Sequence, residues 1–394
     1  MRIAISGAGV AGTALAHWLH RAGHSPTLIE RAPAFRTGGY MIDFWGIGYR
    51  VTRRMGIEQA IRDAGYDVRC VRSVGSDGAT RAELGVEVFR RMIGNNFTSL
   101  PRGDLAAAIY RTVEHTVPTV FADSITGIDQ RPDDVRVTFE NRAADDFDLI
   151  IGADGLHSNV RRLVFGPEER FEHYLGCKVA ACVVDGYRPR SGEARSDLYL
   201  TYSVPGRQVG QFTLRGDRTM FLFVFRDQHD DHGMTPKEQL HNQFDDAGWQ
   251  CRQILAAVDG VDDLYFDVVS QIRMDSWSHE RTLLIGDAAG CISLLGGEGT
   301  GLAITEAYAL AGELTRSGCD YVRAFECYES RLRPFIEGKQ AGAERMLGFF
   351  ATRTRFGLWW RNVAMRAMNL GRPVAGLFAG SVRDNLVLPD YQIG

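Results

Sequence analysis

Three apolar runs along the chain each stop at a segment that contains glycine, and two of these segments also contain an acidic residue. The first, residues 3–5, leads through the glycine-rich segment 6–12 into apolar residues at helical spacing, and another strand pattern follows at residues 25–29. This order predicts a strand, a tight turn, a helix and a second strand. Two later runs, residues 149–151 and 282–285, stop at segments that pair glycine with an acid. We therefore expect an α/β fold whose strand ends form one ligand-binding edge.

Residues 174–226 change to short alternating or apolar stretches that are separated by turn residues. This pattern is typical of antiparallel strands. Gly216-Asp217 is a hairpin signal. Residues 220–225 are all apolar, so both faces of that strand should be covered. The predicted strands are 177–184, 197–203, 208–215 and 218–226.

The segment from Met346 to Gly380 is rich in apolar residues and is interrupted by arginines. Its aromatic residues recur roughly at helical spacing, which predicts a basic amphipathic helix. Two interpretations remain open. The helix either bridges two parts of the protein, which we favour, or lies on a membrane surface.

Composition excludes several classes of protein. The 394 residues include 45 Lys and Arg against 49 Asp and Glu, and this near balance gives no electrostatic reason to bind nucleic acid. Seven cysteines without a CxxC pair argue against a disulfide framework. No signal-peptide pattern and no run of 18 uncharged apolar residues occurs. We expect a cytoplasmic protein without stable membrane insertion, either a monomer or a homodimer.

The glycines of the first motif have distinct physical roles. Gly7 permits the turn, Gly9 lets the backbone approach a pyrophosphate, and Gly12 lets the helix pack tightly on the strand. The N–H groups at the start of the helix then face the phosphates. Glu30 ends the second strand, where its carboxylate can accept hydrogen bonds from ribose and would repel a 2′-phosphate. These features favour FAD or NAD.

The ordered set of motifs resembles the group A flavoprotein monooxygenases, the family of para-hydroxybenzoate hydroxylase and of the tetracycline-inactivating monooxygenases. The resemblance covers residues 1 to about 315. It implies a Rossmann-type FAD-binding domain with an inserted antiparallel-sheet substrate domain and a C-terminal bridging helix. The motifs are Gly7-x-Gly9-x-x-Gly12 with Glu30, Pro101-Arg102-Gly103-Asp104-Leu105, Asp154-Gly155 with Ser158 and Arg161, and Gly286-Asp287 followed by a glycine-rich helix start.

The resemblance also implies how the chain is divided. Residues 1–72, 96–170 and 271–340 would bind FAD, residues 73–95 and 171–270 would form the substrate domain, and residues 341–394 a C-terminal helical segment. For Asp154, a capped strand-to-helix turn is an equal alternative to cofactor contact. The implied FAD-binding residues are Gly7, Gly9, Ala11, Gly12, Glu30, Arg31, Arg36, Arg102, Asp154, Asp287, Gly297, Gly299, Thr300 and Gly301.

A hydrophobic or aromatic substrate is expected, because aromatic residues and methionine are frequent on the predicted strands. For any single one of these residues a place in the core is the favoured interpretation, and only as a set do they favour such a substrate. The candidate substrate-binding residues are Tyr40, Tyr202, Gln211, Phe212, Met220 and Phe223.

The loop after Asp287 departs from the family pattern. Gly290 replaces a histidine, Leu294-Leu295 a proline pair, Glu298 a glutamine and Gly301 an asparagine. Because loop length is kept, we still expect FAD to bind. The carboxylate of Glu298 would place a negative charge beside the isoalloxazine ring. FAD binding is therefore a firmer expectation than the hydroxylation reaction.

No nucleophile arrangement and no metal-ligand spacing such as HExxH occurs, so catalysis should reside in the flavin. The leading hypothesis is an FAD-dependent monooxygenase that uses NAD(P)H as a transient co-substrate and O2. It would hydroxylate an aromatic or polyketide-like molecule through a flavin C4a-hydroperoxide. The alternatives are a flavin-dependent reductase or dehydrogenase of an isoprenoid-like substrate, and a non-redox protein that uses FAD structurally.

Overall fold

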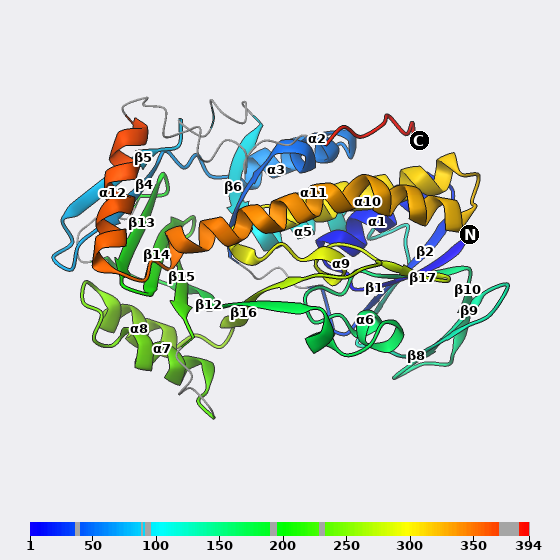
Figure 1. The fold of residues 1–394 in the computed structure, drawn as a ribbon, viewed down its shortest axis with the longest axis horizontal. Coiled ribbons are helices and arrows are strands. Elements are labelled where there is room, and N and C mark those ends of the chain that lie inside the picture. Colours follow the sequence, from blue (N-terminus) through cyan, green and yellow to red (C-terminus); the bar gives the residue numbers. More distant parts are fainter. Residues whose placement is uncertain are drawn as a thin grey trace.

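The computed structural model describes residues 1–35, 40–87, 90, 96–189, 195–227, 233–369 and 386–393. Its chain forms two large sheets, one at each end of an elongated molecule, and a long helix runs from one sheet to the other (Figure 1). A three-stranded sheet and a two-stranded sheet complete the strand pairing of the described residues.

The first large sheet is built around the amino-terminal strand. Its pairs are parallel except for the last two strands at one edge, which are antiparallel. The four segments predicted as strands, at residues 3–5, 25–29, 149–151 and 282–285, are confirmed. In spatial order the strands are β17 (Ser278–His279), β18 (Thr282–Leu284), β11 (Leu149–Gly152), β1 (Arg2–Ser6), β2 (Ser25–Glu30) and β7 (Thr119–Phe121).

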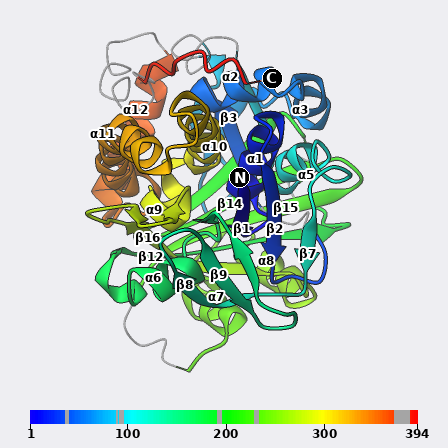
Figure 2. The same cartoon turned by 90° about the vertical axis from the view of Figure 1, so that its right-hand side faces the viewer.

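Helices cover one face of this sheet, and a short helix with a small sheet lies on the other (Figure 2). The covering helices are α1 (Val10–Arg21), α5 (Arg102–Tyr110) and α10 (Gly299–Arg316). The opposite face carries α6 (Asn159–Val164) with β8 (Ile125–Gln130), β9 (Val135–Phe139) and β10 (Asp145–Phe147). Smaller elements are β3 (Met41–Trp45), α2 (Gly46–Arg54), α3 (Glu58–Ala64), β6 (Phe97–Pro101), η1 (Glu168–Arg170), α9 (Asp287–Gly290) and η2 (Leu294–Gly296).

The second large sheet contains the four strands predicted from residues 174–226. The expectation of a fully antiparallel sheet is wrong at one place, because β13 and β4 pair in parallel. A hairpin from residues 70–85, far away along the chain, adds to the sheet at that point. The spatial order is β16 (Tyr265–Ile272), β12 (Glu172–Asp185), β15 (Arg218–Arg226), β14 (Arg207–Leu214), β13 (Leu198–Val204), β4 (Cys70–Val74) and β5 (Thr80–Gly85).

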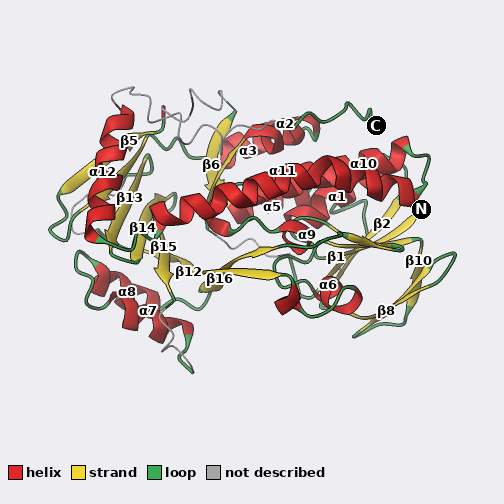
Figure 3. Ribbon diagram, viewed as in Figure 1, coloured by secondary structure: helices red, strands yellow, loops and turns green. Residues whose placement is uncertain are grey.

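Two helices, α7 (Pro236–Phe244) and α8 (Cys251–Asp259), pack on one face of the second sheet. Figure 3 shows them beneath β15 at the end of the molecule away from the N-terminus. The apolar cluster between them contains alternate residues of β12, β13 and β15, and Val209 of β14. The other face of the sheet is therefore free to face the rest of the protein.

The bridge between the two sheets is helix α11 (Tyr321–Phe350), followed by α12 (Arg355–Asn369). The expectation of one bridging helix over residues 346–380 is wrong. Ala351 leaves the helical conformation, and its carbonyl accepts a hydrogen bond from Arg226 Nε at 2.9 Å, so the chain turns there. Helix α12 then packs on β5 and β13. Residues 370–385 lie outside the described part. None of the described helices is long and apolar enough to cross a membrane.

Candidate cofactor and substrate site

A cavity of about 1570 Å³ lies between the two large sheets and is lined from both. We call the part lined by residues of β1, α1, β2, α5 and α10, and of the segment after β11, the cofactor end. The part lined by residues of β4, β5, β13, β14, β15 and α12 is the substrate end. Residues predicted to hold FAD that lie on its wall are Gly7, Gly9, Ala11, Glu30, Arg31, Arg102, Asp154, Asp287, Gly297, Gly299 and Thr300.

The turn between β1 and α1 has the packing that its glycines predict. Gly7 has φ of +101°, which side chains rarely adopt, and a Cβ at Gly12 would lie 1.9 Å from the Gly7 carbonyl oxygen. A Cβ at Gly9 would meet no described atom within 4 Å, because this glycine faces the cavity. No described side chain caps α1 at Gly9, so the first N–H groups of the helix are open to an anion.

Glu30 lies at the carboxyl end of β2, on the cavity wall. Its Oε2 accepts a hydrogen bond from the Ala8 N–H at 3.0 Å, and its Oε1 accepts from the Ala32 N–H at 2.8 Å. These bonds fix the carboxylate beside the glycine turn, and each oxygen retains capacity for a further donor such as a ribose hydroxyl. Arg31 lies next to it on the wall.

Asp154 forms the capped turn that was one of its two interpretations. Its carboxylate accepts from the backbone N–H groups of Asn159 (2.9 Å) and Val160 (3.0 Å), and from the hydroxyls of Ser158 and Ser6. Burial raises the pKa of Asp154, and these donors oppose the rise. The residue thus ties the start of α6 to β1 while lining the cavity; direct cofactor contact stays a prediction.

Arg161, which follows the Asp154-Gly155 motif, is buried. Its side chain is 0% exposed, and it donates to the carbonyls of Ala288 at 3.0 Å and Leu156 at 2.6 Å, and to Glu168 at 2.6 Å. Burial lowers the pKa of its guanidinium, although Glu168 opposes this. Arg161 therefore joins the second glycine-acid motif to the third, whereas Arg162 is exposed.

Asp287 follows Gly286, which has φ of +63°, and is held in the cavity wall from behind. The Gly286 N–H donates to Glu306 Oε2 at 2.6 Å, and the Tyr328 hydroxyl donates to the same oxygen at 3.0 Å. Burial raises the pKa of Glu306 to about 7. Burial also raises the pKa of Asp287, while the charge of Arg102 opposes the rise.

The glycine-rich loop before α10 lies beside α2. Gly297, with φ of +69°, Gly299 and Thr300 line the cavity. Gly301 faces α2 instead, where a Cβ at Gly48 would lie 2.5 Å from its Cα. Gly301 and Gly12 therefore support the wall from behind. Arg36 lies outside the described residues.

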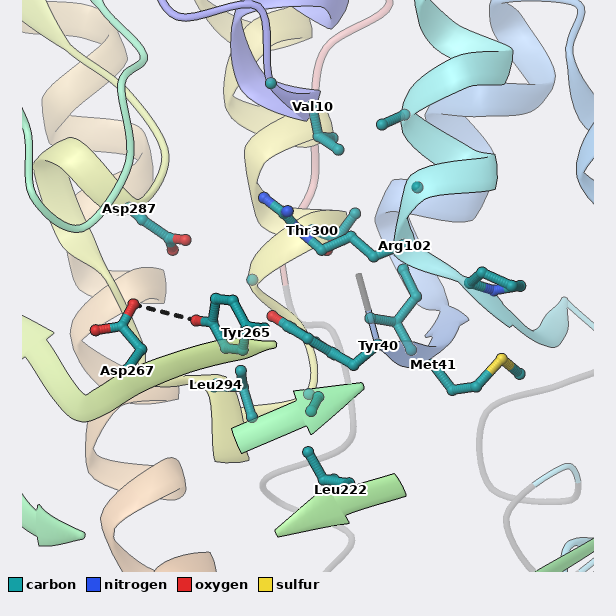
Figure 4. Close-up of a pocket in the computed structure, with 18 of the residues that line it drawn as sticks. Val10, Tyr40, Met41, Arg102, Leu222, Tyr265, Asp267, Asp287, Leu294 and Thr300 are labelled. Carbon is teal, nitrogen blue, oxygen red and sulfur yellow. Dashed lines mark hydrogen bonds between the residues drawn. The ribbon is translucent and has the colours of Figure 1, made fainter. Parts of the chain in front are cut away.

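The departures from the family pattern have structural counterparts. A Cβ at Gly290 would lie 2.9 Å from Ile336 Cγ2 of α11, so the helix occupies the space that a larger side chain would need. Leu294 lies on the cavity wall (Figure 4). Glu298 does place a carboxylate there, but Lys339 Nζ of α11 lies 2.6 Å from its Oε2.

The predicted substrate residues divide between the two faces of the second sheet. Tyr40, Phe212 and Met220 line the cavity, and their role in binding substrate stays a prediction. Tyr202, Gln211 and Phe223 are on the opposite face, so the expectation that they line a substrate cavity is wrong. Neighbouring side chains of a strand point to opposite faces, and the apolar sequence did not say which face packs on the helices.

The misplaced residues form part of the packing against α7 and α8. The Tyr202 hydroxyl donates to the Ala247 carbonyl, and the Phe223 ring lies 5.2 Å from the Phe244 ring. Gln211 is 1% exposed on the same face. Tyr202 and Phe223 therefore pack the sheet against this helical layer, and none of the three residues lines the cavity.

A hydrogen-bonded chain that the sequence did not reveal runs from the surface to the cavity. His157 joins Glu168 (Nδ1 to Oε1, 2.8 Å) and Asp267 (Nε2 to Oδ1, 3.1 Å), and the Tyr265 hydroxyl donates to Asp267 at 3.2 Å. The bond to Asp267 raises the pKa of His157 to about 9. Figure 4 shows Tyr265 beside Tyr40. The centres of the two rings are 5.5 Å apart.

Arg361 of α12 was also missed, because the sequence gives no partner for it. It donates to Gln208 Oε1 and Ser203 Oγ, both at 3.0 Å, and it lines the substrate end with Met365 and Met368. Burial lowers its pKa to about 10.

The cofactor end fits FAD by the nature of its groups. It combines an uncapped helix start for a pyrophosphate, a fixed carboxylate for a ribose, and a buried acid beside a glycine-rich helix start. The substrate end is mainly apolar, with one buried arginine. A single cavity thus has room for a dinucleotide and a second molecule.

Comparisons with known proteins agree with this arrangement. The family described as FAD binding domain matches residues 1–335. An uncharacterised protein of Mycobacterium tuberculosis is 38% identical over 348 residues, covering 86% of this chain and 91% of that protein. A flavin-dependent monooxygenase from an unknown prokaryotic organism is 36% identical over 344 residues, covering 86% and 87%. The crystal structure of tetracycline destructase Tet(51) matches with a TM-score of 0.82 at 28% identity, over 99% of both chains.

Proposed function

Since the chain belongs to the FAD binding domain family and is an FAD-dependent monooxygenase, we propose that it uses NAD(P)H and O2 to hydroxylate a hydrophobic, aromatic or polyketide-like molecule. In the balanced reaction, one C–H bond of the substrate becomes C–OH. The second oxygen atom leaves as water, and NAD(P)H with one proton supplies the remaining hydrogen and the electrons.

The observation that supports this proposal is the continuity of the cavity. Groups suited to a dinucleotide and an apolar wall suited to a second molecule line the same space. The apolar wall includes Phe212, Met220 and Leu222 from the second sheet, and Met365 from α12. Bound FAD would supply the redox chemistry, so the protein needs to contribute position and a dry cavity.

The residues of the chain would contribute binding and orientation. The N–H groups at the start of α1 would hold the pyrophosphate, Glu30 a ribose, and Asp287 the ribityl chain. Glu306 fixes Gly286 and so positions Asp287. The apolar side chains of the substrate end would exclude water around the reacting carbon, while Arg361 would face a polar group of the substrate.

The test uses protein reconstituted with FAD and a panel of aromatic and polyketide substrates. NAD(P)H oxidation that depends on substrate, with one 18O atom from 18O2 in the product, supports hydroxylation. A product without 18O contradicts it and favours the reductase or dehydrogenase alternative. Leu222→Trp is the matched variant, because it fills the substrate end and should abolish product formation while FAD remains bound.

A further inference from the structure

A buried ion pair connects the glycine-rich loop before α10 to helix α11. Lys339 Nζ lies 2.6 Å from Glu298 Oε2, and the two side chains are 7% and 11% exposed. Both residues line the cavity. Removing one charge from such a dry position would leave the other uncompensated. The pair is therefore a fixed electrostatic element of the cavity wall.

Helix α11 is anchored next to this lysine. Gln340 Nε2 donates to the carbonyls of Ile272 at 2.8 Å and Cys291 at 3.0 Å, and Gln271 Nε2 donates to the Gln340 carbonyl at 2.8 Å. The Lys339 ammonium also lies 5.3 Å from the centre of the Phe335 ring. A shift of the lysine would require α11 to move against β16.

Glu298 occupies the N-cap position of α10, but its side chain does not cap the helix. The N-terminus of an 18-residue helix is its positive end, and Gly299 and Thr300 present that end to the cavity. A lone carboxylate at this position would offset the positive end. Lys339 supplies a compensating charge from a different element.

We propose that the Glu298–Lys339 pair sets the reduction potential of FAD bound at the cofactor end, by preserving a positive potential at the start of α10. This inference rests on the proposed placement of the cofactor. Reduction adds negative charge to the isoalloxazine, so the affinity for reduced FAD depends on nearby charge more strongly than the affinity for oxidised FAD. Glu298 and Lys339 act as positioning residues through this field.

Potentials measured by dye equilibration in four proteins test the inference. Lys339→Met should weaken binding of reduced relative to oxidised FAD about tenfold, which lowers the two-electron potential by about 30 mV. Glu298→Gln should shift the potential in the opposite direction by a similar amount. The double variant should return toward the wild-type value, because both charges are removed together.

Matched controls carry the same charge changes away from the cavity. Lys237→Met, on α7, and Glu337→Gln, at an exposed position of α11, should leave the potential unchanged. If Lys339→Met does not fold, Glu298→Gln and the double variant still give the sign and its reversal. The double variant is the safer protein because it contains no unpaired charge at this site.

The outcomes separate this inference from the proposed function. Bound FAD with the same potential in the wild type, Glu298→Gln and the double variant would overturn the inference alone. Failure of the wild-type protein to bind FAD would overturn the proposed cofactor placement and the inference with it. Opposite shifts in the single variants that cancel in the double variant would support both.

Discussion

The cofactor end and the substrate end of the cavity are held in place by different kinds of contact. At the cofactor end, the glycines at 7, 12 and 286 put backbone where side chains do not fit, and buried polar groups fix the loops between them. At the substrate end, the wall is one face of a sheet whose other face packs on α7 and α8. The shape of the cofactor end thus depends on local backbone geometry. The shape of the substrate end depends on which side chains of each strand point into the cavity.

This difference predicts which changes alter the fold and which alter the ligand. A change behind the sheet should destabilise the protein, whereas one on the cavity face should change substrate affinity. At the cofactor end the two effects should coincide, because the residues that fix the backbone also shape the site.

The largest expected effect separates the two faces of β15. Phe223→Ala empties a fully buried position and should lower the free energy of unfolding by about 4 kcal/mol. Met220→Ala, on the cavity face, enlarges an existing space and should lower it by about 2 kcal/mol while raising the substrate KM. Urea unfolding and steady-state kinetics measure both. If the two variants lose the same stability and have the same KM, the two faces of β15 do not differ in the way we propose.

A similar test at the cofactor end adds one methyl group. Gly12→Ala would bring a Cβ within 1.9 Å of the Gly7 carbonyl oxygen, so we expect a loss of about 3 kcal/mol together with weaker FAD binding. Gly338→Ala, inside α11, meets no described atom within 4 Å and serves as the control. The measurements are urea unfolding and FAD titration. Normal FAD affinity in a destabilised Gly12→Ala protein would contradict the coupling.

Arg161→Met tests whether buried hydrogen bonds hold the second and third motifs together. It leaves the carbonyls of Ala288 and Leu156 without their donor, which should cost about 2 kcal/mol. Arg162→Met, one position along and exposed, should change stability by less than about 0.5 kcal/mol. Thermal unfolding of the two variants gives the answer. Similar Tm values would show that Arg161 is dispensable.

The carboxyl behind Asp287 should make stability depend on pH. Burial raises the pKa of Glu306 to about 7 from an ordinary 4.5, so the folded state binds the proton more tightly. The free energy of unfolding should therefore fall as pH rises from about 4.5 to 7. Above about pH 7 the contribution of Glu306 should no longer change with pH. Glu306→Gln should remove that part of the slope in urea unfolding. An unchanged slope would contradict the assignment.

The smallest effect concerns the hydrogen-bonded chain that runs from His157 through Asp267 to Tyr265. The bond to Asp267 raises the pKa of His157 to about 9, so its stabilisation is complete below about 6.5 and is lost as pH rises through 9. Because the His157 side chain is half exposed, the change should be small. We expect the Tm difference between the wild type and His157→Gln to be larger at pH 6 than at pH 10. Equal differences at the two pH values would show that the His157–Asp267 bond does not stabilise the folded protein.

The sequence predicts the cofactor end well, because the close backbone contacts there require glycine at particular positions. Gly7 and Gly12 have the positions their spacing implies, and the four strands of the first sheet follow their apolar runs. The capped turn at Asp154 was one of two open interpretations and is confirmed. The roles of these residues toward FAD stay predictions.

The substrate end could not be predicted to the same depth. In a strand that is apolar at every position, alternation alone does not say whether Met220 or Phe223 faces the cavity. The parallel pairing of β4 and the ion pair of Glu298 with Lys339 depend on segments far apart in the chain. Such contacts arise from tertiary packing, which leaves no local pattern.

A crystal structure of the protein with FAD tests the central claim most directly. The account predicts the pyrophosphate at the start of α1, the adenosine ribose at Glu30, and the isoalloxazine between Asp287 and the substrate end, beside Gly297 and Thr300. Density for FAD outside this cavity, or in it with the ring away from the second sheet, would contradict the account.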